Sequence, residues 1–204
     1  MALIEEMDKS GNWLFRWRSF LPLVLFFGAI PVVLFGNVSW NTMSASPDAS
    51  WVWPLVCLAV GMAGQKVRGL CVGFTPAGTS GRNTKEGQVA ESLNTKGMYS
   101  MCRHPLYLGN LLMWLGIVMY MGHLWFAVAF LLVYALYYER IMFAEEQFLR
   151  GKFGQAYLDW SSEVPAFWPA LGQWKSPDVG FSLRNVLKRE YNGFFAMFLS
   201  FAWV

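Results

Sequence analysis

Long apolar runs divide the chain, and they predict helices of membrane-spanning length. The first run covers residues 19–38 and has no charged residue, and the second begins at Trp51 and stays uncharged as far as Gln65. A helix of about 20 apolar residues is long enough to cross the ~30 Å hydrocarbon core of a bilayer. Two further runs cover residues 106–121 and 124–138. The pattern therefore predicts an all-α membrane helix bundle.

The third and fourth runs are separated only by Gly122 and His123, so they predict a tight antiparallel helical hairpin. A fifth apolar segment, residues 191–204, is short for a span. The first run exceeds the 7–15-residue apolar region of a signal peptide, and no small-x-small cleavage site follows it directly, so we interpret it as a retained span. We expect a polytopic bundle of four to five transmembrane helices, with residues 1–204 forming a single membrane domain.

Composition and charge agree with a membrane protein and give it an orientation. The chain is 55% hydrophobic and only 14% charged, whereas soluble domains carry about 25% charged residues. All 16 Lys and Arg residues lie before residue 19 or within residues 66–103, 140–152 and 175–189. Cations mark the cytoplasmic side of a membrane protein. We therefore expect an integral protein of a bacterial or archaeal cytoplasmic membrane, with its polar site facing the cytoplasm.

Other classes of site receive little support from the sequence. There is no basic stripe or reader motif typical of nucleic-acid binding. The cysteines are odd in number and have no metal-ligand spacing, so we expect reduced thiols and no metal site. Residues 75–95, rich in Gly, Ser, Thr and Asn, predict a cytoplasmic loop, and residues 151–178, where aromatics alternate with prolines, predict a short irregular cap at the interface.

The first cluster of chemically capable residues opens the third run. Proline is favoured at the first helical position, so a helix is expected to begin at Pro105 with His104 at its N-cap. Free N–H groups at such an end attract anions. Tyr107 lies three residues after His104 and shares its face, and Gly109 lets a flat ligand or another helix approach. Alternatively, Arg103 and His104 are interfacial anchors and Tyr107 belongs to an aromatic belt.

The second cluster ends the fourth run and contains Glu139, Arg140, Glu145 and Glu146. The tight hairpin returns this helix end beside residues 103–109. Carboxylates there suit hydroxyl, amine or cationic groups, and a nearby arginine keeps them ionised. Alternatively, the segment is a solvated helix exit in which Glu146 pairs with the arginine four residues later. Ionisable residues near hydrocarbon are costly and tend to be functional, which favours a site.

The motifs in this order resemble the isoprenylcysteine carboxyl methyltransferase family and the related phospholipid methyltransferases. The resemblance covers residues 80–170, the expected methyltransferase-like core, and it is carried by Asn94-Thr95-Lys96-Gly97-x-Tyr99-x3-Arg103-His104-Pro105-x-Tyr107-x-Gly109, then by Glu145-Glu146, Phe153-Gly154-x-x-Tyr157 and Val164-Pro165. It implies an integral membrane methyltransferase that binds S-adenosylmethionine in a cytoplasmic pocket. The cofactor-binding residues that it implies are His104, Pro105, Tyr107, Leu108, Gly109, Glu145 and Glu146. The catalytic residues that it implies are Arg103, His104, Arg140 and Glu146.

The acceptor implied by the resemblance is a lipidic or prenylated molecule that enters from the bilayer. A carboxylate acceptor needs only an arginine to orient it, whereas an amine must lose a proton to His104 or to a glutamate. Two alternatives stay open. One is an NADPH-dependent membrane reductase of the sterol-reductase type, for which a longer chain with more spans is expected. The other is a non-enzymatic lipid-binding protein. The sequence leaves the oligomeric state undetermined.

Overall fold

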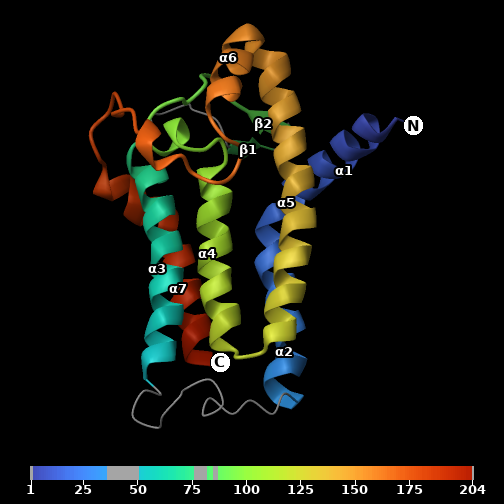
Figure 1. The fold of residues 1–204 in the computed structure, drawn as a ribbon, viewed down its shortest axis with the longest axis vertical. Helices are drawn as coiled ribbons and strands as arrows, with labels where there is room; N and C mark the ends of the chain where they lie inside the picture. The colour runs from blue at the N-terminus through green and yellow to red at the C-terminus, as the bar shows by residue number, and fades with distance from the viewer. Residues whose placement is uncertain (1, 36–50, 76–81, 85–86, 204) are drawn as a thin grey trace.

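The computed structural model describes residues 2–35, 51–75, 82–84 and 87–203, and within these residues the chain is helical apart from one short β-ribbon (Figure 1). The helices are α1 Leu3–Trp17, α2 Leu21–Phe35, α3 Val52–Gly73, α4 Pro105–Tyr120, α5 Leu124–Phe153, α6 Gln155–Glu163 and α7 Leu183–Trp203. The ribbon pairs β1 Arg82–Thr84 antiparallel with β2 Gly87–Val89, inside the stretch expected to be a loop. The predicted helical class is confirmed.

The long helices run side by side along the longest dimension of the molecule (Figure 1). Helix α3 packs along α4, α7 contacts both, and α5 lies on the other side of α4 with α1 against it. The β-ribbon, α6 and the start of α4 gather at one end of the bundle, and the α4–α5 turn lies at the other end (Figure 1). We call these the cap end and the hairpin end.

The tight hairpin between α4 and α5 is present as predicted. Gly122 has φ +74°, a left-handed conformation that glycine adopts without steric cost, and it closes the turn between Tyr120 and Leu124. Helix α5 continues to Phe153, well beyond the predicted end at residue 138. Its 30 residues span about 45 Å at 1.5 Å per residue, which brings its charged second half to the cap end.

Helices α3 and α4 approach each other closely because glycines line their contact. A Cβ atom at Gly64 would lie 2.5 Å from the carbonyl oxygen of Gly109, and one at Gly116 would lie 2.6 Å from the carbonyl oxygen of Cys57. Small residues at such positions allow helix backbones to meet, as they do within membranes. Gly109, which was expected to admit a ligand or another helix, therefore faces helix α3.

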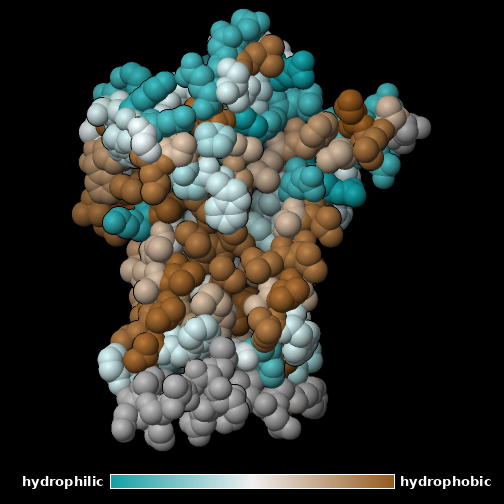
Figure 2. Space-filling view, viewed as in Figure 1, coloured by the Kyte–Doolittle hydropathy of each residue, from teal (hydrophilic) through white to brown (hydrophobic). Residues whose placement is uncertain are grey.

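Two helices, α3 and α5, are long and apolar enough to cross a membrane by length and composition. Helix α4 is apolar but has only 16 residues. The fifth apolar segment forms the second half of α7, which begins at Leu183. Figure 2 shows apolar side chains over the bundle toward the hairpin end and polar ones at the cap end. Spanning by α2, α4 and α7 stays a prediction, and the segment between α2 and α3 lies outside the described residues.

The predicted irregular cap is partly helical. Helix α6 occupies residues 155–163, because Gly154 has φ +54° and turns the chain sharply after α5. Residues 164–175 then pair with the segment before α4. The Arg103 amide donates to the carbonyl of Pro165 at 2.9 Å, and the Gly97 amide donates to that of Lys175 at 2.9 Å. These bonds hold the segment before α4 against the end of α5.

Candidate functional site

The two polar clusters identified in the sequence meet at the cap end of the bundle. His104 precedes the first residue of α4, and Glu145 and Glu146 lie in the second half of α5. The Nε2 atom of His104 lies 2.9 Å from Oε1 of Glu146. The antiparallel hairpin is what joins them, since these residues are more than 40 positions apart in the chain. Their expected proximity is confirmed.

Arg103 is held entirely by the protein. Its Nε donates to Oε1 of Glu146 at 2.9 Å and its Nη2 to Oε2 at 3.3 Å. Its Nη1 donates to the carbonyl oxygens of Ser161 and Val164, at 2.7 and 2.9 Å. The guanidinium thus ties α5 to the end of α6, and both oxygens of Glu146 have a partner.

Glu145 is held from one side only. Its Oε2 accepts a hydrogen bond from the hydroxyl of Tyr107 at 2.8 Å and lies 3.6 Å from Nδ1 of His104. Tyr107 is itself fixed, because the hydroxyl of Tyr134 donates to its carbonyl oxygen at 2.6 Å. Within the described residues, no hydrogen bond reaches Oε1 of Glu145. Glu145 therefore keeps one carboxylate oxygen for a ligand.

His104 is buried between the two carboxylates, and its ring stacks on that of Tyr107 with centroids 5.6 Å apart. Burial by itself lowers the pKa of His104, but hydrogen bonds and charge from Glu145 and Glu146 outweigh burial and raise the pKa above its usual value of 6.5. The Nε2 atom of His104 lies within hydrogen-bond distance of Glu146, and its Nδ1 lies at ion-pair distance from Glu145. These contacts favour the cationic form of His104 and disfavour its use as a base.

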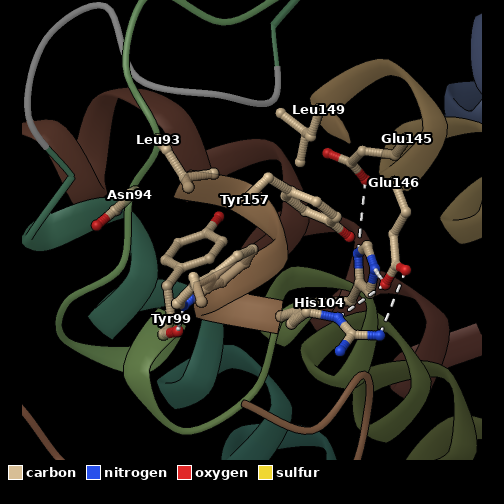
Figure 3. A pocket seen from close by; sticks show the side chains of 10 residues that line it. Leu93, Asn94, Tyr99, His104, Glu145, Glu146, Leu149 and Tyr157 are labelled. Atoms are coloured by element: carbon tan, nitrogen blue, oxygen red, sulfur yellow. Dashed lines mark hydrogen bonds and ion pairs between the residues drawn. The ribbon is translucent and has the colours of Figure 1, made fainter. Parts of the chain in front are cut away.

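A small pocket opens beside these residues (Figure 3). Aromatic rings form much of its wall, and the two carboxylates and one amide give it polar groups. The lining residues are Leu93, Asn94, Tyr99, Arg103, His104, Glu145, Glu146, Leu149, Tyr157 and Trp160. A flat, cationic ligand with hydroxyl groups matches this combination of rings and acidic acceptors.

Tyr157 gives the pocket an unsatisfied polar group. Its hydroxyl is buried and has no hydrogen-bond partner among the described residues. Burial and the neighbouring carboxylate of Glu146 raise the pKa of Tyr157, so the phenol stays neutral and remains a donor. Figure 3 shows its ring reaching across the pocket toward His104. A buried hydroxyl without a partner is costly, and a bound ligand would satisfy it.

Four of the residues expected to bind the cofactor lie behind the pocket wall. Pro105 and Leu108 are buried in the start of α4, and Tyr107 supports Glu145 from behind. Gly109 faces α3, where an added Cβ atom would lie 2.5 Å from Cγ of Arg68. These residues shape the site without lining it.

The expected anion site at the start of α4 is filled by the protein. The amides of Arg103 and His104 donate to the carbonyls of Pro165 and Ala166, and that of Tyr107 donates to the carbonyl of His104. The helix start therefore binds residues 164–166 instead of presenting these amides to a ligand.

Arg140 lies away from the pocket. It is exposed on α5, and its Nη1 donates to Oγ of Ser10 in α1 at 3.1 Å. The alternative interpretation of this segment, in which Glu146 pairs with Arg150, is also not seen, because Glu146 bonds Arg103 and His104 instead.

Several pocket residues were absent from the predicted site. Asn94, Tyr99 and Tyr157 belong to the motif that carries the family resemblance, so the motif itself was the signal for them. Trp160 was interpreted as an interfacial aromatic residue, but it lines the pocket and its Nε1 donates to the carbonyl of Tyr99 at 3.2 Å. Leu93 and Leu149 gave no signal in the sequence.

Comparison with known proteins supports the motif-based expectation. A family model described as phospholipid methyltransferase matches residues 55–156, half of the chain. The matched region runs from α3 into α6 and contains both polar clusters. The resemblance to this family expected from the motifs is thereby confirmed.

Two curated bacterial proteins are similar over most of the chain. The cobalt-zinc-cadmium resistance protein CzcN of Cupriavidus metallidurans is 31% identical over 80% of this chain and 69% of its own length. The nickel-cobalt-cadmium resistance protein NccN of Alcaligenes xylosoxydans xylosoxydans is 29% identical over 78% of this chain and 66% of its own length. The chain thus spans about two thirds of the relatives that it matches. No solved structure shows significant similarity.

Proposed function

This chain belongs to the phospholipid methyltransferase family, and we propose that it transfers a methyl group from S-adenosylmethionine to the polar group of a lipidic acceptor. The observation that carries the proposal is the pocket at the cap end, where, among the described residues, Oε1 of Glu145 accepts no hydrogen bond and the hydroxyl of Tyr157 has no partner. Bound S-adenosylmethionine supplies a methyl group activated by its sulfonium charge.

The pocket residues suit that cofactor. Oε1 of Glu145 offers an acceptor for hydroxyl groups and negative charge for the cation, while the rings of Tyr99, Tyr157 and Trp160 offer faces for a flat base. Arg103 and His104 hold the glutamates in place, so their carboxylates are positioned before the cofactor binds.

The state of His104 favours one class of acceptor. An amine must lose a proton before it accepts a methyl group, but His104 is paired with both glutamates, and this pairing raises its pKa and opposes its use as a base. An acceptor that already carries an anionic oxygen, such as a carboxylate, needs no base. We infer a lipidic or prenylated carboxylate as the preferred acceptor, with amine headgroups as the competing class.

The proposed setting is the cytoplasmic face of a membrane. Helices α3 and α5 have the length and composition of spans, and the cap end carries the pocket. We propose that α2, α4 and α7 complete a bundle of four to five spans. An acceptor would then enter from the bilayer and the cofactor from the cytoplasm.

The names of the two relatives concern resistance to metal ions. Within the described residues, no group of three or more His, Cys, Asp or Glu side chains is arranged to hold a metal ion. The proposal for this chain therefore rests on the family and on the pocket. If this chain shares a role in metal resistance with its relatives, we propose that methylation of a membrane component provides that resistance.

Binding measurements on the purified protein in detergent test the cofactor. Calorimetry with S-adenosylmethionine, with its demethylated product and with NADPH should show binding of the first two only. Binding of NADPH alone would favour the reductase, and binding of none would favour a lipid-binding protein. Mass spectrometry of lipids from cells with and without the protein should then reveal an acceptor heavier by one CH₂ unit.

A further inference from the structure

Helix α1 lies outside the family match and has three distinct faces. At 3.6 residues per turn, Gly11 and Phe15 share the face buried against α5. A second face exposes Leu3, Trp13 and Trp17, which are 71%, 61% and 48% exposed. The third face carries Glu5 and Arg16, whereas Glu6 lies between Trp13 and Trp17 and Lys9 lies one turn before Trp13, at the edge of the second face. Exposed tryptophan and leucine side chains grouped in this way are unusual for a helix in water.

The place where α1 docks fixes its height along the bundle. The exposed face of α5 is apolar as far as Leu136 and becomes charged at Glu139 and Arg140. Helix α1 packs on α5 where these apolar residues give way to charged ones. The Tyr137 hydroxyl donates to the carbonyl of Leu14 at 3.3 Å, and a Cβ atom at Gly11 would lie 2.1 Å from the carbonyl oxygen of Arg140.

The rise per residue of α5 gives the distance between the α1 contact and the hairpin end. At 1.5 Å per residue, the stretch of α5 from Tyr137 to Ala144 lies about 20–30 Å from Leu124 at the hairpin end. In a ~30 Å hydrocarbon core that begins at Leu124, this stretch covers about the last 10 Å and ends at the boundary on the pocket side. Figure 1 shows α1 leaving the bundle sideways beside α5, whereas the long helices follow the longest axis.

The exposed aromatic residues of α1 form one group. The ring centroids of Trp13 and Trp17 are 6.4 Å apart, and those of Trp17 and Phe20 are 5.3 Å apart. Tryptophan favours the headgroup region of a bilayer, where its ring meets acyl chains and its N–H meets water. Acidic residues at positions 5, 6 and 8 outnumber the basic Lys9 and Arg16, so attraction to anionic lipids would not hold this helix in place.

We propose that α1 is an interfacial helix that lies in the headgroup region on the pocket side of the membrane. Trp13 and Trp17 then face the acyl chains, while Glu5 and Arg16 face water. This inference rests on the proposed membrane setting of the function above.

Such a helix would fix the height of the site relative to the lipid. Phe15, on the buried face of α1, belongs to the same core cluster as Tyr107 and Tyr138, and Tyr107 holds Glu145. Cζ of Arg18 lies 3.9 Å from the centre of the Phe15 ring. The lipid-facing helix and the wall behind the pocket therefore form one packed unit, which keeps the pocket at the level of lipid headgroups.

Spin labels attached to single introduced cysteines test this placement. The full chain, reconstituted into phosphatidylcholine vesicles, would carry a label at Trp17→Cys or Arg16→Cys, with Leu132→Cys on α5 as the lipid reference and Asp159→Cys on α6 as the water reference. All four positions are exposed on the protein, and the native cysteines are buried. Collisions with oxygen report lipid, and collisions with a water-soluble nickel complex report water.

The label at position 17 should collide mainly with oxygen and the label at position 16 mainly with nickel. Adding phosphatidylglycerol should leave both unchanged. If positions 16 and 17 both report water while position 132 reports lipid, α1 lies off the membrane and the inference is wrong although the membrane setting holds. If position 132 also reports water, the membrane setting fails and the inference with it.

Discussion

At the scale of single residues, the two adjacent glutamates of α5 have different environments. Glu146 has hydrogen bonds to both carboxylate oxygens, and these come from Arg103 and His104. Glu145 leaves Oε1 without a bond from the described residues. We therefore propose that Glu145 contacts the cofactor directly and that Glu146 supports it, whereas the motifs implied cofactor binding by both glutamates and a catalytic role for Glu146.

The first prediction concerns the Glu145→Gln variant. A hydrogen bond to a charged group contributes about 1.5–3 kcal/mol, so loss of the charge should weaken binding of S-adenosylmethionine by roughly 10- to 100-fold. Calorimetry on the purified variant measures this change. The matched control is Glu163→Gln on α6, whose carboxylate is 71% exposed, and its affinity should equal that of the unmodified protein. Equal affinity in both variants would remove Glu145 from the cofactor site.

A second prediction follows from the protonation of His104. Its folded pKa is raised above the unfolded value of about 6.5, so its contribution to stability is fully present below pH 6.5 and is lost as pH rises through the folded pKa. The melting temperature in detergent should therefore fall with rising pH above neutrality. His104→Gln should lower the melting temperature most at low pH. It should also remove the fall of the melting temperature with rising pH that His104 causes. His123→Gln should retain it, and a pH-independent difference between His104→Gln and the unmodified protein would contradict the assignment.

The sequence predicted correctly which polar residues of the candidate site would lie together, because their positions followed from the hairpin. Arg103, His104, Glu145 and Glu146 had to meet if the two runs were antiparallel, and they do. The sequence could not distinguish residues that line the pocket from residues that support it. Tyr107 shares the His104 side of α4, yet its hydroxyl points to the back of Glu145, which depends on how α4 and α5 pack.

At the scale of elements, the glycine contacts between α3 and α4 lead to a third prediction. Gly116→Ala places a Cβ atom 2.6 Å from the Cys57 carbonyl oxygen and 2.8 Å from the Gly61 nitrogen. Both are backbone atoms, so a change of side-chain rotamer cannot relieve the clash. Overpacking of this kind costs about 1–3 kcal/mol. Gly28→Ala in α2, where no atom lies within 4 Å, should instead gain up to about 1 kcal/mol from helix propensity. Melting in detergent compares the two, and equal effects would show that α3 and α4 do not pack this closely.

A buried ion pair joins α3 to α7. Nε of Arg68 donates to Oε2 of Glu190 at 2.7 Å and Nη2 donates to Oε1 at 2.8 Å, while Nη1 bonds the side chain of Asn110 in α4. Glu190 is 2% exposed. A charge pair buried among helices of membrane-spanning length is costly unless both partners are satisfied, so the pair fixes how α7 sits on α3 and α4.

The fourth prediction is that Glu190→Gln destabilises the protein by about 3 kcal/mol, because it leaves the Arg68 guanidinium partly buried without a counter-charge. Chemical denaturation in detergent measures the free energy of unfolding. Asp178→Asn, which breaks the exposed pair between Lys96 and Asp178, is the control and should change stability by less than about 1 kcal/mol. The combined variant Arg68→Met with Glu190→Leu should recover most of the loss. A single Glu190→Gln variant as stable as the control would contradict a structural role for the pair.

The apolar runs predicted the positions of five helices, since hydrophobic length is the strongest signal in such a chain. The ends were harder to predict. Helix α5 extends 15 residues past its apolar run because no proline follows and its charged half packs on α1 and the cap. Helix α1 was not predicted, because its apolar residues are interrupted by charges and its helical form is supported by packing on α5.

At the scale of the whole molecule, the pocket and the α4–α5 turn occupy opposite ends of the bundle (Figure 1). The basic residues that flank helices α4 and α5 lie toward the pocket end, and the turn between these two helices has none. By the positive-inside rule, we expect the pocket to face the cytoplasm and the turn to lie outside. Helix α5 connects the two ends, so a label near each end of this helix can determine the orientation.

The fifth prediction is that a membrane-impermeant maleimide applied to intact cells labels Leu124→Cys and leaves Asp159→Cys unlabelled. Leu124 begins α5 at the hairpin end and is 80% exposed, while Asp159 is exposed on α6 at the cap end. Cys57, Cys71 and Cys102 are buried, so the unmodified protein should react little and serves as the background control. Breaking the cells should make position 159 reactive without changing position 124. If position 159 reacts in intact cells and position 124 does not, the pocket faces outward, where a cytoplasmic cofactor cannot reach it. If both react in intact cells, α5 does not separate two compartments, and the membrane-spanning arrangement of the hairpin is wrong.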